Sequence, residues 1–555
     1  MEHAQSLLDC IERLPKDPKR GFRFIDALGE ERFYSYRDLE KEAKHRAAVL
    51  YQKGLKKGDR LALVIPDGHE FVLSFLGAVA GGIIPVPIFP RATFKAIESY
   101  HDTVAHILQA STATMLLSTE AMKPYLEPVL KHDVKVSEIA TVDLFEKSDV
   151  AAIECPALGP EDLCFLQFTS GSTSKPKGVM VSHGNLLANA RAFLGPHGLD
   201  RRKDDLAVSW LPLYHDMGLI GFILGTLVMD IPVVIFPTAS FARNPRLWLE
   251  TINKHKATLT FAPNFAYALV AKRVRDADLS KWDLSSIRVS GCGAEPINAT
   301  TLRAFADRLK PAGFNANAFL PYGMAEATLA ITFSPQGQGM KTDRVDAKAL
   351  QQGKAAPATD ATETTLELVS CGKAFPEHEL AIVDEQGNKL AERQVGEIIT
   401  QGPSITKGYY QNPEASAESW KKGWLHTGDL GYIAEGNLFI CGRSKDLIII
   451  NGANHYPQDL EWQVDSLPGV RRNNVVAFSS IIDGEERLVM VAEGNSGDAA
   501  SLRHDIASRI TETTGLKVHK VAIVPVGTLP KTSSGKAQRR KTKQLFEKNV
   551  LPEHL

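Results

Sequence analysis

Residues 162–183 gather hydroxyl groups, glycines and lysines into one loop between two apolar stretches. The sequence is DLCFLQFTSGSTSKPKGVMVSH, and the polar loop spans 169–178. Hydroxyls and closely approachable backbone amides can donate several hydrogen bonds to a polyphosphate. The GxxxxGK[ST] spacing of a Walker A loop is absent. A flexible polar loop is the alternative interpretation, but two lysines flanking Pro176 directly after a predicted buried strand favour phosphate binding.

Five further segments place charged or aromatic residues beside turns. They are SGCGAEP (290–296), PYGMAEATLA (321–330), WLHTGDLGYI (424–433), CGRSKDLIIINGANHYPQDLE (441–461) and PKTSSGKAQRRKT (530–542). Taken singly, each has an ordinary structural explanation, such as a strand-to-helix turn, a Gly-Asp turn, a charged linker or a solvated basic end. Their order along the chain is more informative than any one of them.

Together with loop 169–178, these segments resemble the motifs of the adenylate-forming superfamily of acyl-CoA synthetases, peptide-synthetase adenylation domains and firefly luciferase. The resemblance covers roughly residues 15 to 545. It implies that ATP and Mg²⁺ are used to activate a carboxylic acid as an acyl-AMP. The loop residues expected to contact the ATP phosphates are Thr169, Ser170, Gly171, Ser172, Thr173 and Lys177.

The resemblance assigns the adenine and metal sites to two of these segments. Tyr322 matches the aromatic residue that stacks on adenine, and Glu326 matches the glutamate that helps to hold Mg²⁺. A single carboxylate suits Mg²⁺, which retains water and phosphate oxygens as its other ligands. Ala325 replaces the usual threonine and removes one hydroxyl contact to the α-phosphate. The other residues expected around the nucleotide are Gly291, Gly293, Ala294, Glu295, Gly323 and Met324.

The remaining roles implied by the resemblance concern the ribose, the hinge and catalysis. Asp429 is expected to bind both ribose hydroxyls, and Arg443 to reach the ribose and phosphates. Lys445 matches the pivot of a small C-terminal domain. Lys536 matches the catalytic lysine that bridges carboxylate and α-phosphate, with Glu326 and Thr169 as further catalytic residues. The basic run Arg539, Arg540 and Lys541 is interpreted as a solvated end, with an acidic carrier protein as the alternative partner.

Several segments resemble one branch of the superfamily, the fatty acyl-AMP ligases. They are SWLPLYHDMGLIG (209–221), FAPNFAYALV (261–270), YGMAEATLA and NGANHYPQDLE (451–461). In this branch His215 is expected near the acyl pocket, which Gly291 would also border. The polar stretch 335–367 lies where these ligases carry an insertion that packs between the domains and disfavours the CoA-using conformation. We expect it to be a surface segment with one short helix.

The resemblance implies a medium- or long-chain fatty acid as substrate. The activated acyl group would pass to the phosphopantetheine thiol of an acyl carrier protein. No carrier-like segment follows Leu555, so the carrier is expected to act in trans. Two alternatives stay open, namely an acyl-CoA ligase with the same first step and an inactive nucleotide- or lipid-binding protein.

The elements that must position these residues alternate between strands and helices. LALVIP (61–66), ATLTFAP and SIRVSG read as buried strands, each followed by a helical stretch. This predicts an α/β fold with largely parallel sheets. We expect a large N-terminal adenylation domain at 1–442, with its insertion at about 335–367, and a small, mobile C-terminal α+β lid domain at 443–555. NNVVAFSS, RLVMVAEG and VAIVPV are its predicted strands, with a helix from Ala499 to about Thr513.

Composition narrows the class of protein and its surroundings. The chain has 555 residues, a formal net charge of -1 and no basic stripe with interleaved aromatics, so nucleic acid is not an expected partner. Its six cysteines form no CxxC pair, and the N-terminus lacks the features of a signal peptide. The apolar stretch 219–236 is interrupted by Asp230 and Pro232, which favours a buried helix, turn and strand over an integral membrane segment. A cytoplasmic location is expected.

Overall fold

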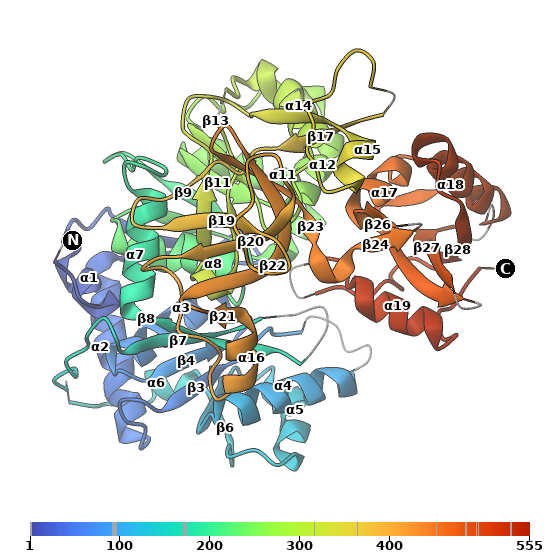
Figure 1. Ribbon diagram of the computed structural model, residues 1–555. Coiled ribbons are helices and arrows are strands. Elements are labelled where there is room, and N and C mark those ends of the chain that lie inside the picture. Colours follow the sequence, from blue (N-terminus) through green and yellow to red (C-terminus); the bar gives the residue numbers. More distant parts are fainter. Residues whose placement is uncertain are drawn as a thin grey trace.

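Two lobes of unequal size make up the protein. The computed structural model describes residues 3–91, 97–151, 153–169, 175–315, 317–362, 364–450, 452–482, 485–495, 497, 499–532 and 535–554. The large lobe contains the N-terminus, and the small orange-to-red lobe contains the C-terminus on the other side of the molecule (Figure 1). Strand β23 (Asn437–Arg443) is the last strand of the large lobe's sheets, so the chain passes between the lobes next to the predicted hinge.

A seven-stranded sheet forms the centre of the large lobe. Its strand order is β13-β12-β11-β9-β10-β1-β2, with every neighbouring pair parallel except β1 and β2. This confirms the predicted α/β class with largely parallel strands. The strands are β1 (Gly21–Ile25), β2 (Glu31–Ser35), β9 (Ala207–Ser209), β10 (Val233–Ile235), β11 (Leu259–Ala262), β12 (Val289–Cys292) and β13 (Asn317–Phe319).

Helices and aromatic side chains cover this sheet. Trp210 stacks on Phe241 with a centroid separation of 3.7 Å, and Trp248 packs edge-on against Tyr267 at 5.4 Å. All four rings are almost fully buried, so they anchor the helices to the strands. The helices around the sheet are α1 (Leu7–Arg13), α2 (Tyr36–Gln52), α7 (His183–Leu194), α10 (Thr238–Arg243), α11 (Arg246–His255), α12 (Asn264–Arg273), α13 (Asp276–Leu279) and α14 (Ala299–Leu309).

A second parallel sheet has the order β4-β3-β5-β6 and carries the predicted strand 61–66. Its strands are β3 (Arg60–Leu63), β4 (Ile84–Pro87), β5 (Met115–Ser118) and β6 (Ile139–Thr141), with helices α3 (Gly68–Ala80), α4 (Ile97–Ser111), α5 (Lys123–Leu126) and α6 (Asp143–Glu146). Beside it, β7 (Leu163–Thr169) and β8 (Lys177–Ser182) pair in antiparallel fashion. The predicted phosphate loop therefore connects the two arms of a hairpin.

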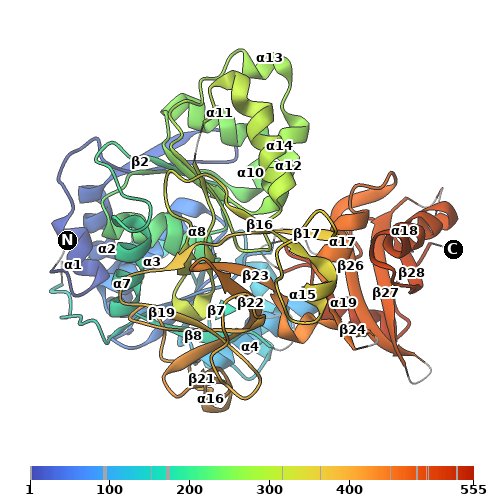
Figure 2. The same cartoon turned by 45° about the horizontal axis from the view of Figure 1, so that its top comes forward.

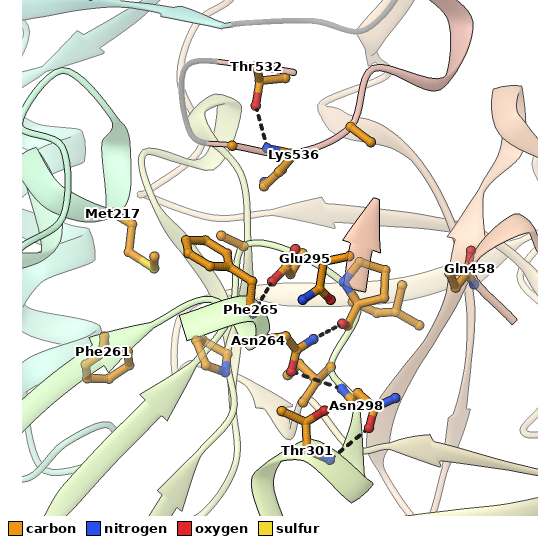
Figure 3. Close-up of a pocket in the computed structure, with 18 of the residues that line it drawn as sticks. Met217, Phe261, Asn264, Phe265, Glu295, Asn298, Thr301, Gln458, Thr532 and Lys536 are labelled. Carbon is orange, nitrogen blue, oxygen red and sulfur yellow. Dashed lines mark hydrogen bonds between the residues drawn. The ribbon is translucent and has the colours of Figure 1, made fainter. Parts of the chain in front are cut away.

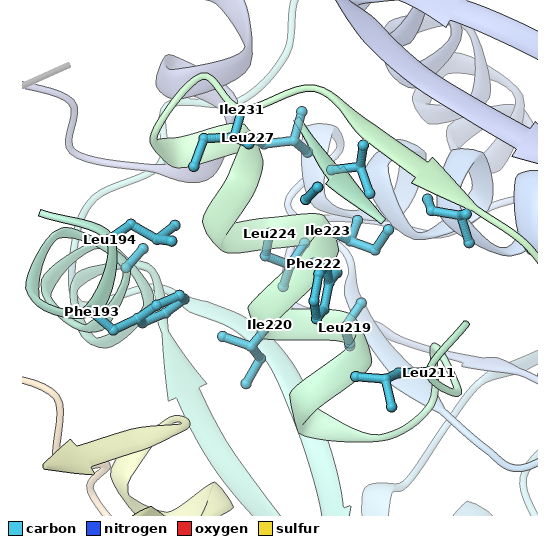
Figure 4. Packing of buried hydrophobic residues seen from close by; sticks show 14 of the residues in the cluster. Phe193, Leu194, Leu211, Leu219, Ile220, Phe222, Ile223, Leu224, Leu227 and Ile231 are labelled. Atoms are coloured by element: carbon cyan, nitrogen blue, oxygen red, sulfur yellow. The ribbon is translucent and has the colours of Figure 1, made fainter. Parts of the chain in front are cut away.

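The apolar stretch 219–236 forms the predicted buried helix, turn and strand. Helix α8 (Asp216–Leu219) continues through a π-helical turn (Ile220–Leu224) into α9 (Gly225–Val228), and β10 follows. Leu224 and Leu227 are completely buried, and the helix packs against Phe193 and Leu194 of α7 (Figure 4). None of the described helices is both long enough and apolar enough to cross a membrane.

The inserted stretch 335–367 is more regular than the sequence predicted. It contains the expected short helix, α15 (Ala347–Gln351), but also β16 (Thr342–Asp346), which pairs with β17 (Thr365–Val369). The prediction of a surface segment was wrong for part of it, because Val345 and Leu350 are buried in one cluster with Phe439 of β23 and Tyr456 of the small lobe. Figures 1 and 2 both show α15 beside the small lobe.

Further antiparallel strands complete the large lobe. Strands β14 (Tyr322–Gly323), β15 (Ala330–Phe333) and β18 (Lys373–Ala374) form one small sheet. The other sheet consists of β19 (Glu379–Val383), β20 (Gly396–Gln401), β21 (Trp420–Lys421), β22 (Trp424–Ala434) and β23, with helix α16 (Pro413–Ser419) beside it. This second sheet places 424–443 between the two lobes.

The small lobe has the predicted α+β composition. Strands β26 (Val470–Ile482), β27 (Glu485–Gly494) and β28 (Val518–Val524) form its sheet. Helices α17 (Pro457–Val464) and α18 (Ala499–Thr514) cover one face, and α19 (Arg539–Glu547) contributes Phe546 to the other. Residues alternate between the faces, as expected for strands buried on both sides. The hairpin β24 (Ile448–Ile450) and β25 (Ala453–His455) follows the hinge.

Candidate active site between the lobes

A cavity of about 1320 Å³ lies where the two lobes meet, and both contribute to its wall. Thr169, at the end of β7, borders it. Ser170, Gly171, Ser172 and Thr173 lie outside the described residues. Other predicted site residues that line the cavity are His215, Ala294, Glu295, Tyr322, Gly323, Met324, Ala325, Glu326, Asp429, Arg443 and Lys536. Residues more than 360 positions apart in sequence therefore share one cavity wall.

Tyr322, Asp429 and Arg443 form a connected group in this wall. Tyr322 Oη donates a hydrogen bond of 2.7 Å to Asp429 Oδ2, and Arg443 Nε donates one of 2.8 Å to Asp429 Oδ1. Asp429 of β22 and Arg443 of β23 are paired directly across the two strands. The nearby aspartate holds the pKa of Arg443 above its ordinary value, and burial raises that of Tyr322. The Asp429 carboxylate is fixed from both sides.

Glu326 lies on a short 3₁₀ turn, Ala325–Ala327, directly before a strained backbone turn. Thr328 has φ 68° and ψ −64°, and Leu329 N–H donates to Ala327 O at 2.8 Å, which defines a γ-turn of the rarely adopted hand. Thr328 Oγ1 donates to Ser404 O at 2.7 Å and stabilises the turn. Burial raises the pKa of the Glu326 carboxyl. A nearby cation would favour its ionised form, so this carboxylate suits a metal ion.

Lys536 reaches the cavity from the loop before α19 of the small lobe. Figure 3 shows it opposite Glu295 and Phe265, with its backbone N–H donating to Thr532 Oγ1 at 3.1 Å. Burial lowers the pKa of the Lys536 ammonium, whereas the carboxylates of Asp216 and Glu295 act in the opposite direction. A buried cation under the influence of nearby carboxylates can stabilise the negative charge of a bound substrate.

His215 and Asp216 are neighbouring polar residues of the cavity wall. The His215 Nδ1 atom lies 2.7 Å from Asp216 Oδ1. Burial alone would raise the pKa of Asp216, but the neighbouring histidine outweighs it and the pKa is lowered. The cavity wall also includes the apolar side chains of Phe193, Leu194, Phe222, Phe261 and Leu269.

Two predicted glycines and two predicted lysines do not line the cavity. A Cβ on Gly291 would lie 1.9 Å from the Phe261 ring, so packing against that ring explains this glycine. Gly293 packs against Pro321, because a Cβ added to Gly293 would lie 3.1 Å from Pro321 Cγ. Lys177 Nζ lies 4.8 Å from the Tyr409 ring centroid. The carbonyl of Lys445, in the hinge turn Ser444–Asp446, accepts a hydrogen bond from Arg540.

The basic run after Lys536 is only in part the solvated end that the sequence predicted, because Lys541 is exposed whereas Arg539 is held by ion pairs. Arg539 donates hydrogen bonds to Asp446 at 3.0 Å and to Glu461 at 2.7 Å, and only 20% of its side chain is exposed. These ion pairs attach α19 to the hinge turn and to α17. They form because acidic partners 78 and 93 residues away fold onto the same surface.

Three residues near the site were missed by sequence reasoning. Asn264 and Gln458 line the cavity, and Asn264 accepts the N–H of Asn298 at 3.2 Å. Tyr409 donates a hydrogen bond to Glu326 Oε1 at 2.7 Å. The local signal for Tyr409 was the glycine followed by two tyrosines in KGYY. This pattern is also typical of the ends of strands, so it did not point to the site.

Comparison with known proteins agrees with this geometry. The family model described as AMP-binding enzyme matches residues 15–410, and the model described as Disco-interacting protein 2-like, AMP domain, matches 445–554. A Caulobacter vibrioides protein provisionally named an acyl-CoA synthetase is 38% identical over 518 residues, covering 92% of this chain and 90% of that protein. The medium-chain-fatty-acid--[acyl-carrier-protein] ligase JamA of Moorena producens is 32% identical over 537 residues, with coverages of 93% and 90%.

A solved structure from a study of fatty acyl-adenylate ligases of E. coli and L. pneumophila has the same fold. It superposes with a TM-score of 0.93 and 34% sequence identity, covering 99% of this chain and 98% of that one. These matches confirm the resemblance inferred from the motifs. The chain belongs to the AMP-binding family of adenylate-forming enzymes and, within it, to the ATP-dependent fatty acyl-AMP ligases.

Proposed function

We propose that this enzyme activates a medium- or long-chain fatty acid with Mg-ATP and passes the acyl group to an acyl carrier protein acting in trans. The observation that carries the proposal is the position of Lys536. This small-lobe residue lines the same cavity as Tyr322, Glu326 and Asp429 of the large lobe. The cavity therefore combines a mobile-domain cation with an aromatic ring and two carboxylates, which suits formation of an acyl-adenylate.

In the first step, a carboxylate oxygen of the fatty acid attacks the α-phosphorus of ATP. A bond forms between that oxygen and phosphorus, and the bond to the bridging oxygen breaks, so pyrophosphate leaves. Asp429 accepts hydrogen bonds from the ribose, and the Tyr322 ring lies against adenine. Lys536 provides positive charge between the two anionic reactants. Catalysis then depends mainly on positioning and charge stabilisation.

The residues present fit a Mg²⁺ ion bound chiefly to the nucleotide. Glu326 is the proposed protein ligand, because it is a buried carboxylate on the cavity wall. Its Oε1 atom accepts a hydrogen bond from the neutral hydroxyl of Tyr409. When bound, Mg²⁺ neutralises charge on the leaving pyrophosphate. The loop 169–178, which begins at Thr169 and ends beside Lys177, is the proposed phosphate-binding segment.

The apolar half of the cavity supports a fatty acyl substrate. Phe193, Phe222, Phe261 and Leu269 come from four different elements, and all of them line the cavity. Burying an alkyl chain there stabilises binding by about 0.8 kcal/mol for each methylene group. Such a wall offers little to a short or strongly polar acid.

In the second step, the small lobe rotates at Lys445 and withdraws Lys536. The phosphopantetheine thiol then loses its proton to solvent, and its sulfur attacks the acyl carbonyl carbon. A thioester forms as the bond from that carbon to the phosphate oxygen breaks, and AMP leaves. The name of the JamA relative, which specifies an acyl carrier protein, supports this acceptor. The cluster of Val345, Leu350 and Tyr456, which joins the insertion to the small lobe, supports restricted use of other acceptors.

The test is acyl-AMP formation from a panel of fatty acids with Mg-ATP, followed by addition of CoA or of a holo acyl carrier protein. We expect acyl-AMP to accumulate with CoA and to be consumed with the carrier protein. Efficient acyl-CoA formation would instead favour an acyl-CoA ligase, the second candidate, which the provisional name of the Caulobacter relative supports. ATP binding without pyrophosphate release would indicate an inactive nucleotide-binding protein.

A further inference from the structure

Tyr409 lies in a segment that runs alongside the first residues of strand β8. Met180 N–H donates to Gly408 O at 3.1 Å, and Tyr410 N–H donates to Gly178 O at 2.8 Å. These two bonds hold the segment antiparallel to the first residues of β8. Tyr409 is therefore fixed beside the point where the proposed phosphate-binding loop rejoins regular structure.

The hydroxyl group of Tyr409 is committed to Glu326. It donates a hydrogen bond of 2.7 Å to Oε1, and the two residues are only 7% and 8% exposed. The same chain segment also holds the Glu326 backbone, because its carbonyl accepts both the N–H and the Oγ1 of Thr406, at 3.0 Å and 2.9 Å. Segment 406–409 thus fixes Glu326 through main chain and side chain together.

The aromatic face of Tyr409 is committed to Lys177. The Lys177 ammonium lies 4.8 Å from the ring centroid, within the range of a cation–π interaction. Trp420 packs edge-on against the ring at 5.2 Å, and Ser416 Oγ accepts the Tyr409 N–H at 2.9 Å. With its backbone bonded and its ring enclosed, the tyrosine has little freedom to turn away.

We propose that Tyr409 is a positioning residue that sets the Glu326 carboxylate and the Lys177 ammonium at a fixed separation beside the ATP phosphates. This inference rests on the proposed function of the cavity. Tyr409 itself need not touch the nucleotide. Its hydroxyl orients the carboxylate offered to Mg²⁺, as hydrogen-bonded partners of metal ligands generally do. Its ring orients the Lys177 ammonium, so this one side chain positions both a negative and a positive group.

Two substitutions separate these effects. Tyr409→Phe keeps the ring and removes only the hydroxyl, whereas Tyr409→Leu removes both interactions. We expect Tyr409→Phe to raise the Mg²⁺ concentration needed for half-maximal ATP binding about tenfold. Tyr409→Leu should lower ATP affinity about threefold further, because the cation–π contact is also lost. ATP binding is measured by calorimetry across a Mg²⁺ series without fatty acid, so no turnover contributes.

Tyr410→Phe is the matched control, since Tyr410 packs against the core around Leu166 and should give unchanged Mg²⁺ dependence. Thermal unfolding of each variant shows whether it is folded. Unchanged Mg²⁺ dependence in folded Tyr409→Phe overturns the inference. Absence of pyrophosphate release by the unaltered enzyme contradicts the proposed function, while the ATP-binding comparison still decides the role of Tyr409. If the unaltered enzyme binds no ATP, both are overturned.

Discussion

Asp429 and Arg443 face each other across neighbouring strands, and Arg443 Nε donates a hydrogen bond of 2.8 Å to Asp429 Oδ1. Asp429 lies in the body of the large lobe's sheet, whereas Arg443 is the last strand residue before the hinge turn. The pair therefore connects the proposed ribose site with the start of the segment about which the small lobe would rotate. A carboxylate oxygen has two lone pairs, so it can keep this bond and still accept one from ribose.

Asp429→Asn should weaken ATP binding while preserving shape. The amide oxygen accepts weaker hydrogen bonds than a carboxylate, and hydrogen bonds to charged groups contribute about 1.5–3 kcal/mol. We expect the Kd for ATP to rise at least tenfold in calorimetry. Asp360→Asn changes an exposed aspartate of the insertion and is the matched control. Equal ATP affinity in both variants would contradict the proposed ribose contact.

Lys536→Ala should abolish adenylation and leave ATP binding nearly intact. Removing one group that stabilises developing charge typically lowers kcat by a factor of about 100 to 1000. Pyrophosphate release measures the chemical step, and calorimetry measures ATP binding. Lys541→Ala, at an exposed position five residues later, should behave like the unaltered enzyme. Normal pyrophosphate release by Lys536→Ala would falsify the catalytic assignment.

Leu350→Ala should loosen the insertion from the small lobe. Leu350 is 1% exposed and belongs to the cluster that contains Tyr456, so the truncation leaves a cavity and costs about 2–4 kcal/mol. Denaturant unfolding measures this loss, with Leu28→Ala, at an 86% exposed leucine, as control. If the insertion restricts the acceptor, the variant should also form more acyl-CoA. A stable variant with the original acceptor preference would argue against that role.

His183→Gln should reduce the loss of stability in acid. Burial lowers the pKa of His183 to about 4, and its Nδ1 accepts the N–H of Leu7 at 3.2 Å. The unfolded chain takes up a proton near pH 6.5, whereas the folded protein does so near pH 4, so stability declines as pH falls between these values. Above pH 6.5 both states are neutral and the histidine has no pH effect.

The magnitude follows from the pKa difference between the two states. At about 1.4 kcal/mol per pH unit, His183 accounts for roughly 3 kcal/mol of lost stability by pH 4. Glutamine does not titrate and keeps an acceptor, so the slope of unfolding free energy against pH between 4 and 6.5 should become shallower. An identical slope in the variant and the unaltered enzyme would show that other groups dominate.

Local sequence patterns were sufficient for part of the parallel sheets. Strand β3 and helix α3 follow from apolar runs whose lengths suit a buried strand and a helix. The same applies to β26, β27 and α18 in the small lobe. Strand β16 was missed because it is short and largely polar, and because its partner, β17, lies beyond an intervening helix.

The residues of the site were easier to predict than the hydrogen bonds and packing contacts between them. Motif order identified Tyr322, Asp429 and Arg443, but not that two hydrogen bonds join them across 107 and 14 residues. Gly291 was assigned to a ligand, although its neighbour is the Phe261 ring. Such partners depend on tertiary packing, which neither local hydrophobic periodicity nor amino-acid composition reveals.

If the apolar part of the cavity holds the acyl chain as proposed, the contact between Gly291 and Phe261 would make selection of the fatty acid depend on a residue that need not touch it. Phe261 borders the apolar part of the cavity, and an added Cβ at position 291 would lie 1.9 Å from its ring. A larger residue there would force the Phe261 ring to shift and so change the shape of the cavity wall. Strand β12 leads to the proposed adenine site, so it would then also influence which fatty acid fits. Changes that adapt the enzyme to another fatty acid would have to preserve the proposed adenine contacts, so the two specificities would be constrained to evolve together.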